Sequence, residues 1–418
     1  MSMNRLVRLI DFENREAIFE DVHRSYKFSL LTVGQEAPQA ELAFFLTGVQ
    51  QLAQMERRFT LSASDIARIN PNTKTAPVFR SRADSELTAK IYEKVPVLVD
   101  DSKGAQGNPW AFDYMTKMFD MADSSSAFRT AEQLQGKSLS RKGNGWIDGR
   151  DNVWLPLYEA KMMHQFDHRW ATYDQLESRD STQQEKADPG FEPMPRYWLP
   201  KYDVEARLRT KGWKHEWLLG WRDICRSTDE RTTIATAYPA FAIGHTIRNL
   251  FIIDQPSLAA AFISNLSALT FDYIARQKLG GTHLTVETLK QLPVLRPSLY
   301  SPADLAFIVA CVLELTYTSH SMTPFARDLG YAGPPFTWNE DRRAQLRAEL
   351  DAWYARAYGL TRDELRYILD PVDVKGPDYP SETFRVLKKN EIARFGEYRT
   401  AKLVLQARDR LQQGELAG

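Results

Sequence analysis

The pattern of apolar and polar positions divides the chain into a strand-like beginning and a helical end. Residues 26–34 (YKFSLLTVG) and 41–48 (ELAFFLTG) are apolar runs that end at glycine, a pattern typical of buried strands. A strand buried on both faces needs a larger sheet than two strands can form. The pattern therefore predicts that the N-terminal part docks onto another sheet.

Helical spacing of apolar residues begins soon afterwards and dominates the last third of the chain. In residues 82–94, Leu87 and Ile91 fall on one helix face. Later helices are expected over 258–279, 285–292, 304–318, 342–358, 361–369 and 397–411. Gly280-Gly281 and Gly359 are expected to end two of them in a left-handed conformation. Thr361 and Glu364 have the spacing of a capping box.

The middle of the chain is less regular. Residues 111–235 are rich in aromatic side chains, which favours short strands joined by long loops. Residues 174–193 are so polar that they predict a flexible excursion. We therefore expect an α+β fold in three parts, 1–100, 101–296 and 297–418, the last of them helical.

Composition excludes several classes of protein. The 418 residues hold 54 Lys plus Arg and 54 Asp plus Glu, so the formal net charge is zero. Binding of nucleic acid by bulk charge is excluded, whereas a local basic face is not. Two cysteines exclude a disulfide scaffold and fit a reducing compartment. No run approaches the ~18 apolar residues of a membrane helix, so we expect a cytoplasmic protein without a membrane partner.

Common catalytic motifs are missing from the sequence. It contains no glycine-rich phosphate loop and no Gly-x-Ser-x-Gly nucleophile motif. It also lacks the Asn-Pro-Pro-Tyr or Asp-Pro-Pro-Tyr tetrapeptide with which an amino-methyltransferase holds a flipped adenine, and the Gly-x-Gly turn for S-adenosylmethionine. We therefore predict no catalytic residue and no cofactor in this chain.

Two short sequence patterns leave open a nuclease site and a metal site. Asp148 or Asp151 with Glu159 and Lys161 resembles the carboxylate–lysine arrangement of magnesium-dependent nucleases. His164 and His168 would share one face if they were helical, as metal ligands can. No third ligand is evident, so buried histidines or phosphate contacts are favoured and no metal site is predicted. Cys225 and Cys311, far apart in the sequence, are expected to be core residues.

Clusters of basic residues are the best candidates for binding chemistry. The stretch 217–231 (WLLGWRDICRSTDER) holds Arg222, Arg226 and Arg231 with Ser227 between them, and these side chains suit phosphates and base edges. Residues 194–232 carry nine Lys/Arg and six Asp/Glu, a net charge of +3. Lys278 precedes Gly-Gly-Thr-His at 280–283, where the backbone could approach phosphate closely. The alternatives are a solvated ion-paired face and an ordinary helix end.

Four segments in this order resemble a known family. They are 155–168 (LPLYEAKMMHQFDH), 219–224 (LGWRDI), the helix at 258–279, and 280–295 (GGTHLTVETLKQLPVL). The order is similar to the TaqI-like target-recognition domain in the C-terminal part of adenine-specific DNA methyltransferases, including fused type IIG restriction–modification enzymes. The closing segment also resembles type I specificity subunits.

The resemblance extends to both ends of the chain. Residues 70–97 are similar to the connector between methylase and recognition domain, and 343–369 to the C-terminal helices of these enzymes. The resemblance implies that the strands at 26–34 and 41–48 are the last strands of a methylase sheet whose catalytic core is absent here. It assigns 1–100 to a methylase-sheet remnant and connector, 101–296 to a DNA target-recognition domain and 297–418 to a C-terminal helical domain.

The function implied is sequence-specific DNA recognition in a restriction–modification or phage-defence system. Double-stranded DNA and a methylase subunit or domain would be the partners, with S-adenosylmethionine and the flipped adenine held by the methylase. The chain would be part of a site-specific adenine methyltransferase and not catalytic alone. The predicted DNA contacts are Lys161, His164, Arg169, Arg222, Arg226, Ser227, Arg231, Lys278, Thr282 and His283.

Two rival functions remain open. A magnesium-dependent DNA nuclease would use Asp151, Glu159 and Lys161. A protein-binding scaffold would use the strands at 26–48 and the C-terminal helices.

Overall fold

The computed structural model describes residues 5–137, 139–150, 152–175 and 177–415 and confirms the α+β class, with 43% helix, 19% strand and four sheets. The strands are β1 (Leu6–Glu13), β2 (Lys27–Val33), β3 (Ala40–Leu46), β4 (Phe59–Leu61), β5 (Asp113–Met115), β6 (Ser140–Lys142), β7 (Gly145–Ile147), β8 (Val153–Tyr158), β9 (Ala171–Asp174), β10 (Glu177–Asp180), β11 (Trp198–Pro200), β12 (Trp217–Arg222), β13 (Ala235–Pro239), β14 (Ala242–Ile243) and β15 (Ile247–Phe251). The helices are α1 (Ala63–Ile69), α2 (Arg82–Lys94), α3 (Ala131–Gln135), α4 (Gln183–Ala187), α5 (Lys201–Arg209), α6 (Pro256–Ser267), α7 (Leu269–Lys278), α8 (Val286–Lys290), α9 (Pro302–Thr316), α10 (Thr323–Asp328), α11 (Glu340–Ala357), α12 (Arg362–Leu369), α13 (Pro371–Lys375), α14 (Arg385–Phe395) and α15 (Arg399–Gln412).

The N-terminal sheet has the strand order β2-β1-β3-β4, with β1 parallel to β3 and antiparallel to β2. Both expected strands exist and β3 is buried, but β2 is not: Leu30 and Leu31, on opposite faces, are 58% and 57% exposed. The sheet ends at β2, so apolar character there does not lead to burial. The sequence analysis missed β1, in which charged residues interrupt the apolar run.

The recognition region is built from short strands. One sheet has the order β11-β8-β7-β6, with β14 beside β8, and another has the order β13-β12-β15-β5. Gly220 in β12 is needed for close packing, because a Cβ there would lie 2.3 Å from the Tyr238 hydroxyl and 2.7 Å from the Arg248 carbonyl oxygen. The expected excursion at 174–193 is wrong: β10 pairs with β9, and α4 follows with Lys186 buried in an ion pair.

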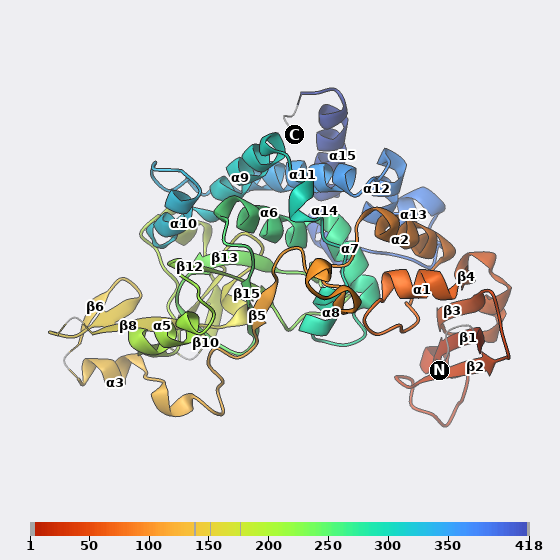
Figure 1. Ribbon diagram of the computed structural model, residues 1–418, viewed down its shortest axis with the longest axis horizontal. Helices are drawn as coiled ribbons and strands as arrows, with labels where there is room; N and C mark the ends of the chain where they lie inside the picture. Colours follow the sequence, from red (N-terminus) through yellow and green to blue (C-terminus); the bar gives the residue numbers. More distant parts are fainter. Residues whose placement is uncertain (1–4, 138, 151, 176, 416–418) are drawn as a thin grey trace.

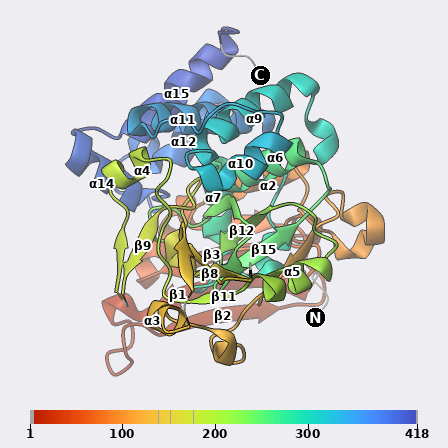
Figure 2. The same cartoon turned by 90° about the vertical axis from the view of Figure 1, so that its left-hand side faces the viewer.

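Helices α9–α15 form the expected C-terminal helical region, which lies over the strands in two perpendicular views (Figures 1 and 2). The largest apolar core includes Phe44, Trp217 and Trp353, one residue from each of the three expected parts. The core is therefore continuous across the proposed boundaries, which stay a prediction.

The expected helix at 258–279 is two helices, because the chain bends by 58° between α6 and α7. Side chains from distant segments bond the backbone groups at the break. Asp351 accepts a hydrogen bond from the Leu269 N–H at 2.7 Å, and Gln165 donates to the Ser267 carbonyl oxygen at 3.3 Å. No local sequence pattern reports such partners, which explains the incorrect prediction.

Helix ends were predicted unevenly. Gly359 has a φ of +80° after α11, and Thr361 and Glu364 form the expected capping box. Gly280 and Gly281 do not have positive φ, so the left-handed end predicted there is wrong. Instead, the Leu279 N–H closes the last turn of α7 by donating to the Ala275 carbonyl oxygen.

Within the described residues, no single helix is long and apolar enough to span a membrane. The bent α6–α7 pair passes that test by length and composition, and most of its side chains are buried inside the protein.

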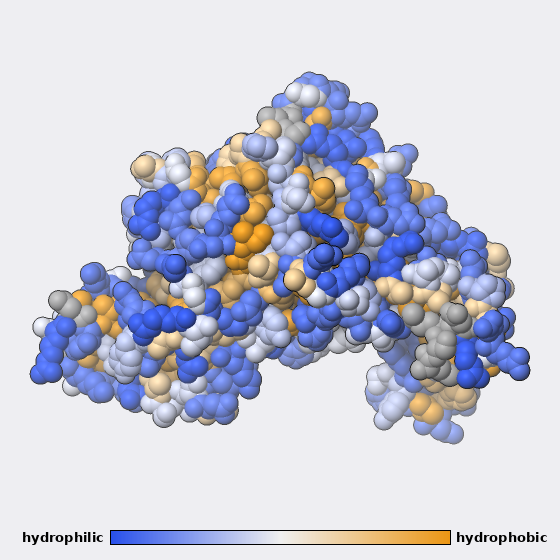
Figure 3. Space-filling view, viewed as in Figure 1, coloured by the Kyte–Doolittle hydropathy of each residue, from blue (hydrophilic) through white to orange (hydrophobic). Residues whose placement is uncertain are grey.

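The molecule is shaped like an arch in the view of Figure 1. The N-terminal sheet and the recognition strands project on either side, and α8 lies between them at the roof. The space-filling view shows a recess at this place, with mostly hydrophilic surface on both sides (Figure 3).

Candidate nucleic-acid interface

The loop after β12 lies against the segment that precedes α8. The Cys225 N–H donates to the Thr282 carbonyl oxygen at 3.0 Å, and Ile224 pairs with His283 as an isolated β-bridge. Buried Asp223 stabilises this contact, since its carboxylate bonds the His283 Nδ1 at 3.1 Å and pairs with Arg248. Two basic segments that are far apart in the sequence are thus neighbours in the fold.

Three of the predicted cations at this place have unused donors. Arg226 is exposed, and its guanidinium makes no hydrogen bond or ion pair with a described residue. Lys161 is exposed with its Nζ 4.8 Å from the centre of the Tyr173 ring. Arg222 is half-buried and donates from Nε to the Ala160 carbonyl oxygen at 2.6 Å, next to Lys161. Burial lowers the pKa of Arg222 to about 10, so it is charged at neutral pH.

The structure therefore brings the segments that carry five predicted residues next to one another. These residues are Lys161, Arg222, Arg226, Thr282 and His283, and we call them the basic loop surface. A flexible cation and two guanidinium groups beside a hydroxyl and an imidazole are suited to contacts with phosphates and base edges.

Three other predicted DNA contacts are internal. Arg169 is 0% exposed, and its terminal nitrogens donate to four carbonyl oxygens, those of Lys186, Asp188, Phe191 and Thr318. Arg231 pairs with buried Asp272 at 2.7 Å. Lys278 donates to the carbonyl oxygens of Ile69 and Gln291 and to the Asn70 side chain at 2.6–2.8 Å. These side chains hold the fold together, and in this structure they are not available to DNA.

The last two predicted contacts are placed differently. His164 lies in a turn, with its ring 4.4 Å from that of Trp170, and lines an internal cavity. Burial and nearby arginines, first Arg222, lower its pKa well below the usual value, so the imidazole is neutral. The Ser227 carbonyl oxygen accepts a hydrogen bond from Arg276 at 3.0 Å, which anchors the loop after β12.

The nuclease arrangement is not assembled among the described residues. Asp151 lies outside them, and Glu159 is engaged by Arg196 through two hydrogen bonds of 2.8 and 2.9 Å. Asp148 accepts hydrogen bonds from nearby backbone N–H groups. No group of three or more His, Cys, Asp or Glu in the described part of the chain could hold a metal ion.

His168 and the two cysteines are buried, whereas His164 is half-buried at the cavity. His164 and His168 are not on a helix, and buried His168 bonds Ser319 and Ser321 at 3.2 Å. Burial raises the pKa of each cysteine thiol to about 12, so Cys225 and Cys311 are protonated at neutral pH.

One organising residue was missed by the sequence analysis. Asp272 is fully buried in α7, where it accepts hydrogen bonds from Arg231, from Arg276 and from the Thr232 N–H. The signal was present, because a carboxylate inside an otherwise apolar helix must find partners. Arg276 is four residues away on the same helix, but Arg231 and Thr232 lie about 40 residues away in sequence, beyond the reach of a local pattern.

Comparisons with known proteins find no match: no protein-family model and no curated protein matches this chain.

Proposed function

We propose that this chain is the DNA-specificity portion of an adenine-specific DNA methyltransferase in a restriction–modification or phage-defence system. The observation that carries the proposal is the basic loop surface, on which Lys161, Arg222 and Arg226 keep unused donors. In contrast, both terminal nitrogens of Arg169, a cation that stabilises the fold, are occupied by carbonyl oxygens. Exposed cations with free donors gathered on one surface are the electrostatic pattern of a nucleic-acid site.

The zero net charge sets an expectation for affinity. A protein without excess positive charge gains little non-specific attraction to phosphates. We therefore expect weak duplex binding by this chain alone and tighter binding when a methylase supplies more of the DNA contacts.

The N-terminal sheet offers a place for the methylase. Strand β2 is at the sheet edge, so one side of its backbone is unpaired within the sheet, and Leu30 and Leu31 are exposed on its two faces. An edge strand of this kind accepts a further strand from a partner unless charge or a bulge protects it. The partner would bind S-adenosylmethionine and hold the flipped adenine, and this chain would supply the specificity.

The DNA proposal is tested with Arg222→Ala/Arg226→Ala in a fluorescence-anisotropy titration of labelled duplexes. The double variant should bind at least about 10-fold more weakly, since two phosphate or base contacts are lost. A control double variant, Arg342→Ala/Arg362→Ala, removes two exposed arginines on α11 and α12 and should bind as the unchanged protein does. Equal binding by both double variants would refute the role of the basic loop surface.

The partner proposal is tested by co-purification with the methylase encoded beside this chain. Leu30→Glu/Leu31→Glu should abolish the complex, whereas Leu299→Glu, a matched exposed leucine outside the sheet, should not. A complex that is lost without any loss of duplex binding would separate the two surfaces. A complex that forms normally, with no DNA binding by either the complex or the chain, would favour the scaffold function.

A further inference from the structure

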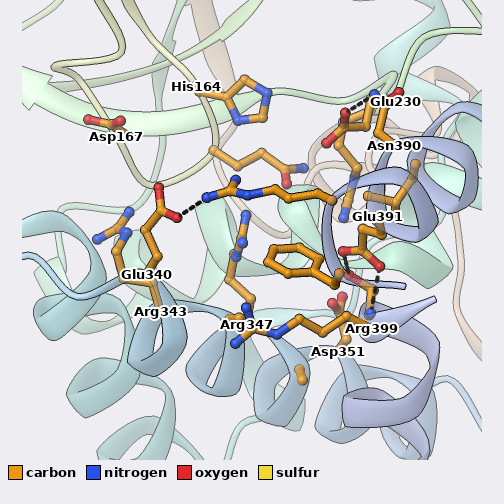
Figure 4. Close-up of a pocket in the computed structure, with 18 of the residues that line it drawn as sticks. His164, Asp167, Glu230, Glu340, Arg343, Arg347, Asp351, Asn390, Glu391 and Arg399 are labelled. Carbon is orange, nitrogen blue, oxygen red and sulfur yellow. Dashed lines mark hydrogen bonds and ion pairs between the residues drawn. The ribbon is translucent and has the colours of Figure 1, made fainter. Parts of the chain in front are cut away.

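A cavity of about 250 Å³ lies where the recognition region meets the C-terminal helices. Its walls come from the turn at 164–170, from Glu230 and Arg231, and from α11, α14 and α15. It lies near the basic loop surface, since the charge of Arg222 helps burial to lower the pKa of His164 in its wall. Figure 4 shows charged side chains from all these segments pointing into the cavity.

Most of the charged side chains in the walls are satisfied by protein. The pairs are Arg394 with Glu340, Arg399 with Asp341, Arg231 with Asp272, Glu391 with Thr400, and Glu230 with Asn390. Arg343 donates to the carbonyl oxygens of Leu315 and Phe166 and stacks on the Trp338 ring at 3.7 Å. These groups stiffen the walls and leave few donors for a ligand.

Among the described charged residues in the cavity walls, Arg347 is the exception. It is exposed to water inside the cavity, and it makes no hydrogen bond or ion pair with a described residue. Its guanidinium stands upright in the middle of the close-up (Figure 4). Asp351 is one helical turn away on α11, yet the two do not pair, and Asp351 accepts its hydrogen bond from the Leu269 N–H.

The donors of Arg347 are free to bind a ligand. Its five N–H groups have no acceptor among the described residues, and the side chain lines the cavity. Desolvation by the walls and then the charge of Arg231 lower the pKa of Arg347, while the carboxylates of Asp351, Glu391 and Glu230 act in the opposite direction. An anion in the cavity would supply the missing acceptor and offset the charge of Arg347.

We propose that the cavity binds a phosphate group through Arg347. The planar guanidinium fork matches phosphate oxygens with two parallel hydrogen bonds. The Phe395 ring, with Arg394 and Arg399 against it at 5.0 and 4.9 Å, gives one wall an apolar surface for the organic part of a phosphomonoester.

The phosphate could belong to a free phosphomonoester or to DNA, and the site does not depend on the proposed DNA function. The probes are inorganic phosphate and adenosine 5′-monophosphate, titrated calorimetrically at constant ionic strength. The unchanged protein and Arg342→Gln should bind alike, since Arg342 is on the same helix but pairs with Glu314 outside the cavity. Arg347→Gln should bind at least about 10-fold more weakly, the expected loss for a charge-assisted bidentate contact.

A second measurement guards against a variant that fails to fold. Without phosphate, Arg347→Gln should unfold at the same temperature as the unchanged protein or higher, because the substitution removes no hydrogen bond or ion pair with a described residue. Addition of phosphate should raise the unfolding temperature of the unchanged protein and of Arg342→Gln, but not that of Arg347→Gln. The proposal is overturned if the unchanged protein binds neither probe, or if Arg347→Gln binds them equally well.

Duplex DNA distinguishes the two sources of phosphate. If Arg347→Gln loses the small probes but keeps its duplex affinity, the ligand is a free phosphomonoester. If it also loses duplex affinity while Arg222 and Arg226 are intact, the cavity takes a phosphate of DNA. Loss of duplex binding in Arg222→Ala/Arg226→Ala with unchanged phosphate binding would show that the two sites are independent.

Discussion

Two neighbouring groups of charged side chains differ in how completely they are paired. In the first, Asp167 bonds the Lys186 Nζ at 2.7 Å and the Arg169 N–H at 2.8 Å, and Arg169 is surrounded by carbonyl oxygens. In the second, Arg347 and Asp351 share a face of α11 without forming a pair. The first group fastens α4 to the turn at 164–170, whereas the second borders an open cavity.

The pKa values of the two carboxylates, Asp167 and Asp351, reflect this difference. Burial would raise the pKa of Asp167, but the charges of Lys186 and Arg343 and two hydrogen bonds hold it at about 2. Burial raises the pKa of Asp351 to about 6, since no cation pairs with it directly. Direct pairing thus marks charges that maintain the structure, and its absence marks charges available to a ligand.

The largest loss of stability is expected from Asp167→Asn. Lys186 would then be buried without a counter-charge, and we expect the free energy of unfolding to fall by about 3–5 kcal/mol. Urea denaturation followed by tryptophan fluorescence measures the change. Asp174→Asn is the control, because it loosens an exposed pair with Arg179 and should cost less than about 1 kcal/mol. Equal losses in the two variants would contradict the anchoring role of Asp167.

A smaller effect is expected from Asp351 and depends on pH. Its folded pKa of about 6 exceeds the unfolded value, so its stabilising contribution is complete below about pH 4 and is lost as the pH rises through 6. The free energy of unfolding should therefore fall by about 2–3 kcal/mol over this window. Asp351→Asn keeps an oxygen acceptor for the Leu269 N–H and should remove that fall.

The measurement is the difference between the stability–pH curves of the two proteins, which cancels groups that titrate in both. A difference that does not change between about pH 4 and 7 would show that Asp351 is ionised throughout this range. Added phosphate should alter the difference, because a bound anion beside Arg347 changes the field at Asp351.

The sequence predicted the elements whose bounds are set by residues within or next to them. The bounds of α2 and the ends of α11 and α12 follow from apolar spacing, a glycine with positive φ and a capping box. The prediction was wrong where residues far away in the sequence determine the structure. The break between α6 and α7 depends on Asp351 and Gln165, and the exposure of β2 depends on which strand ends the sheet.

The candidate sites also have features that the sequence predicted and features that only the folded chain determines. Residue type identified the cations of the recognition region, but not which of them are exposed, because Arg169 and Arg226 look alike in the sequence. The unpaired state of Arg347 was also invisible, since an arginine four residues before an aspartate on a helix normally predicts an ion pair. Burial and partner geometry are properties of the folded chain.

The smallest change in stability is expected at Arg226, which contrasts with Arg231 five positions later in the sequence. Arg226→Ala removes an exposed side chain without a described partner, so the free energy of unfolding should change by no more than about 0.5 kcal/mol. Arg231→Ala removes a partner of buried Asp272 and should cost about 1–3 kcal/mol.

For duplex binding we expect the reverse order: Arg226→Ala should have the larger effect and Arg231→Ala the smaller. Arg226→Ala should weaken duplex binding and reduce the slope of log affinity against log salt by about 1, because one phosphate contact is lost. Arg231→Ala, assayed under conditions where it is folded, should keep the slope of the unchanged protein. If Arg226→Ala lowers stability and leaves the salt slope intact, Arg226 belongs with the anchoring cations and the basic loop surface loses its most exposed member.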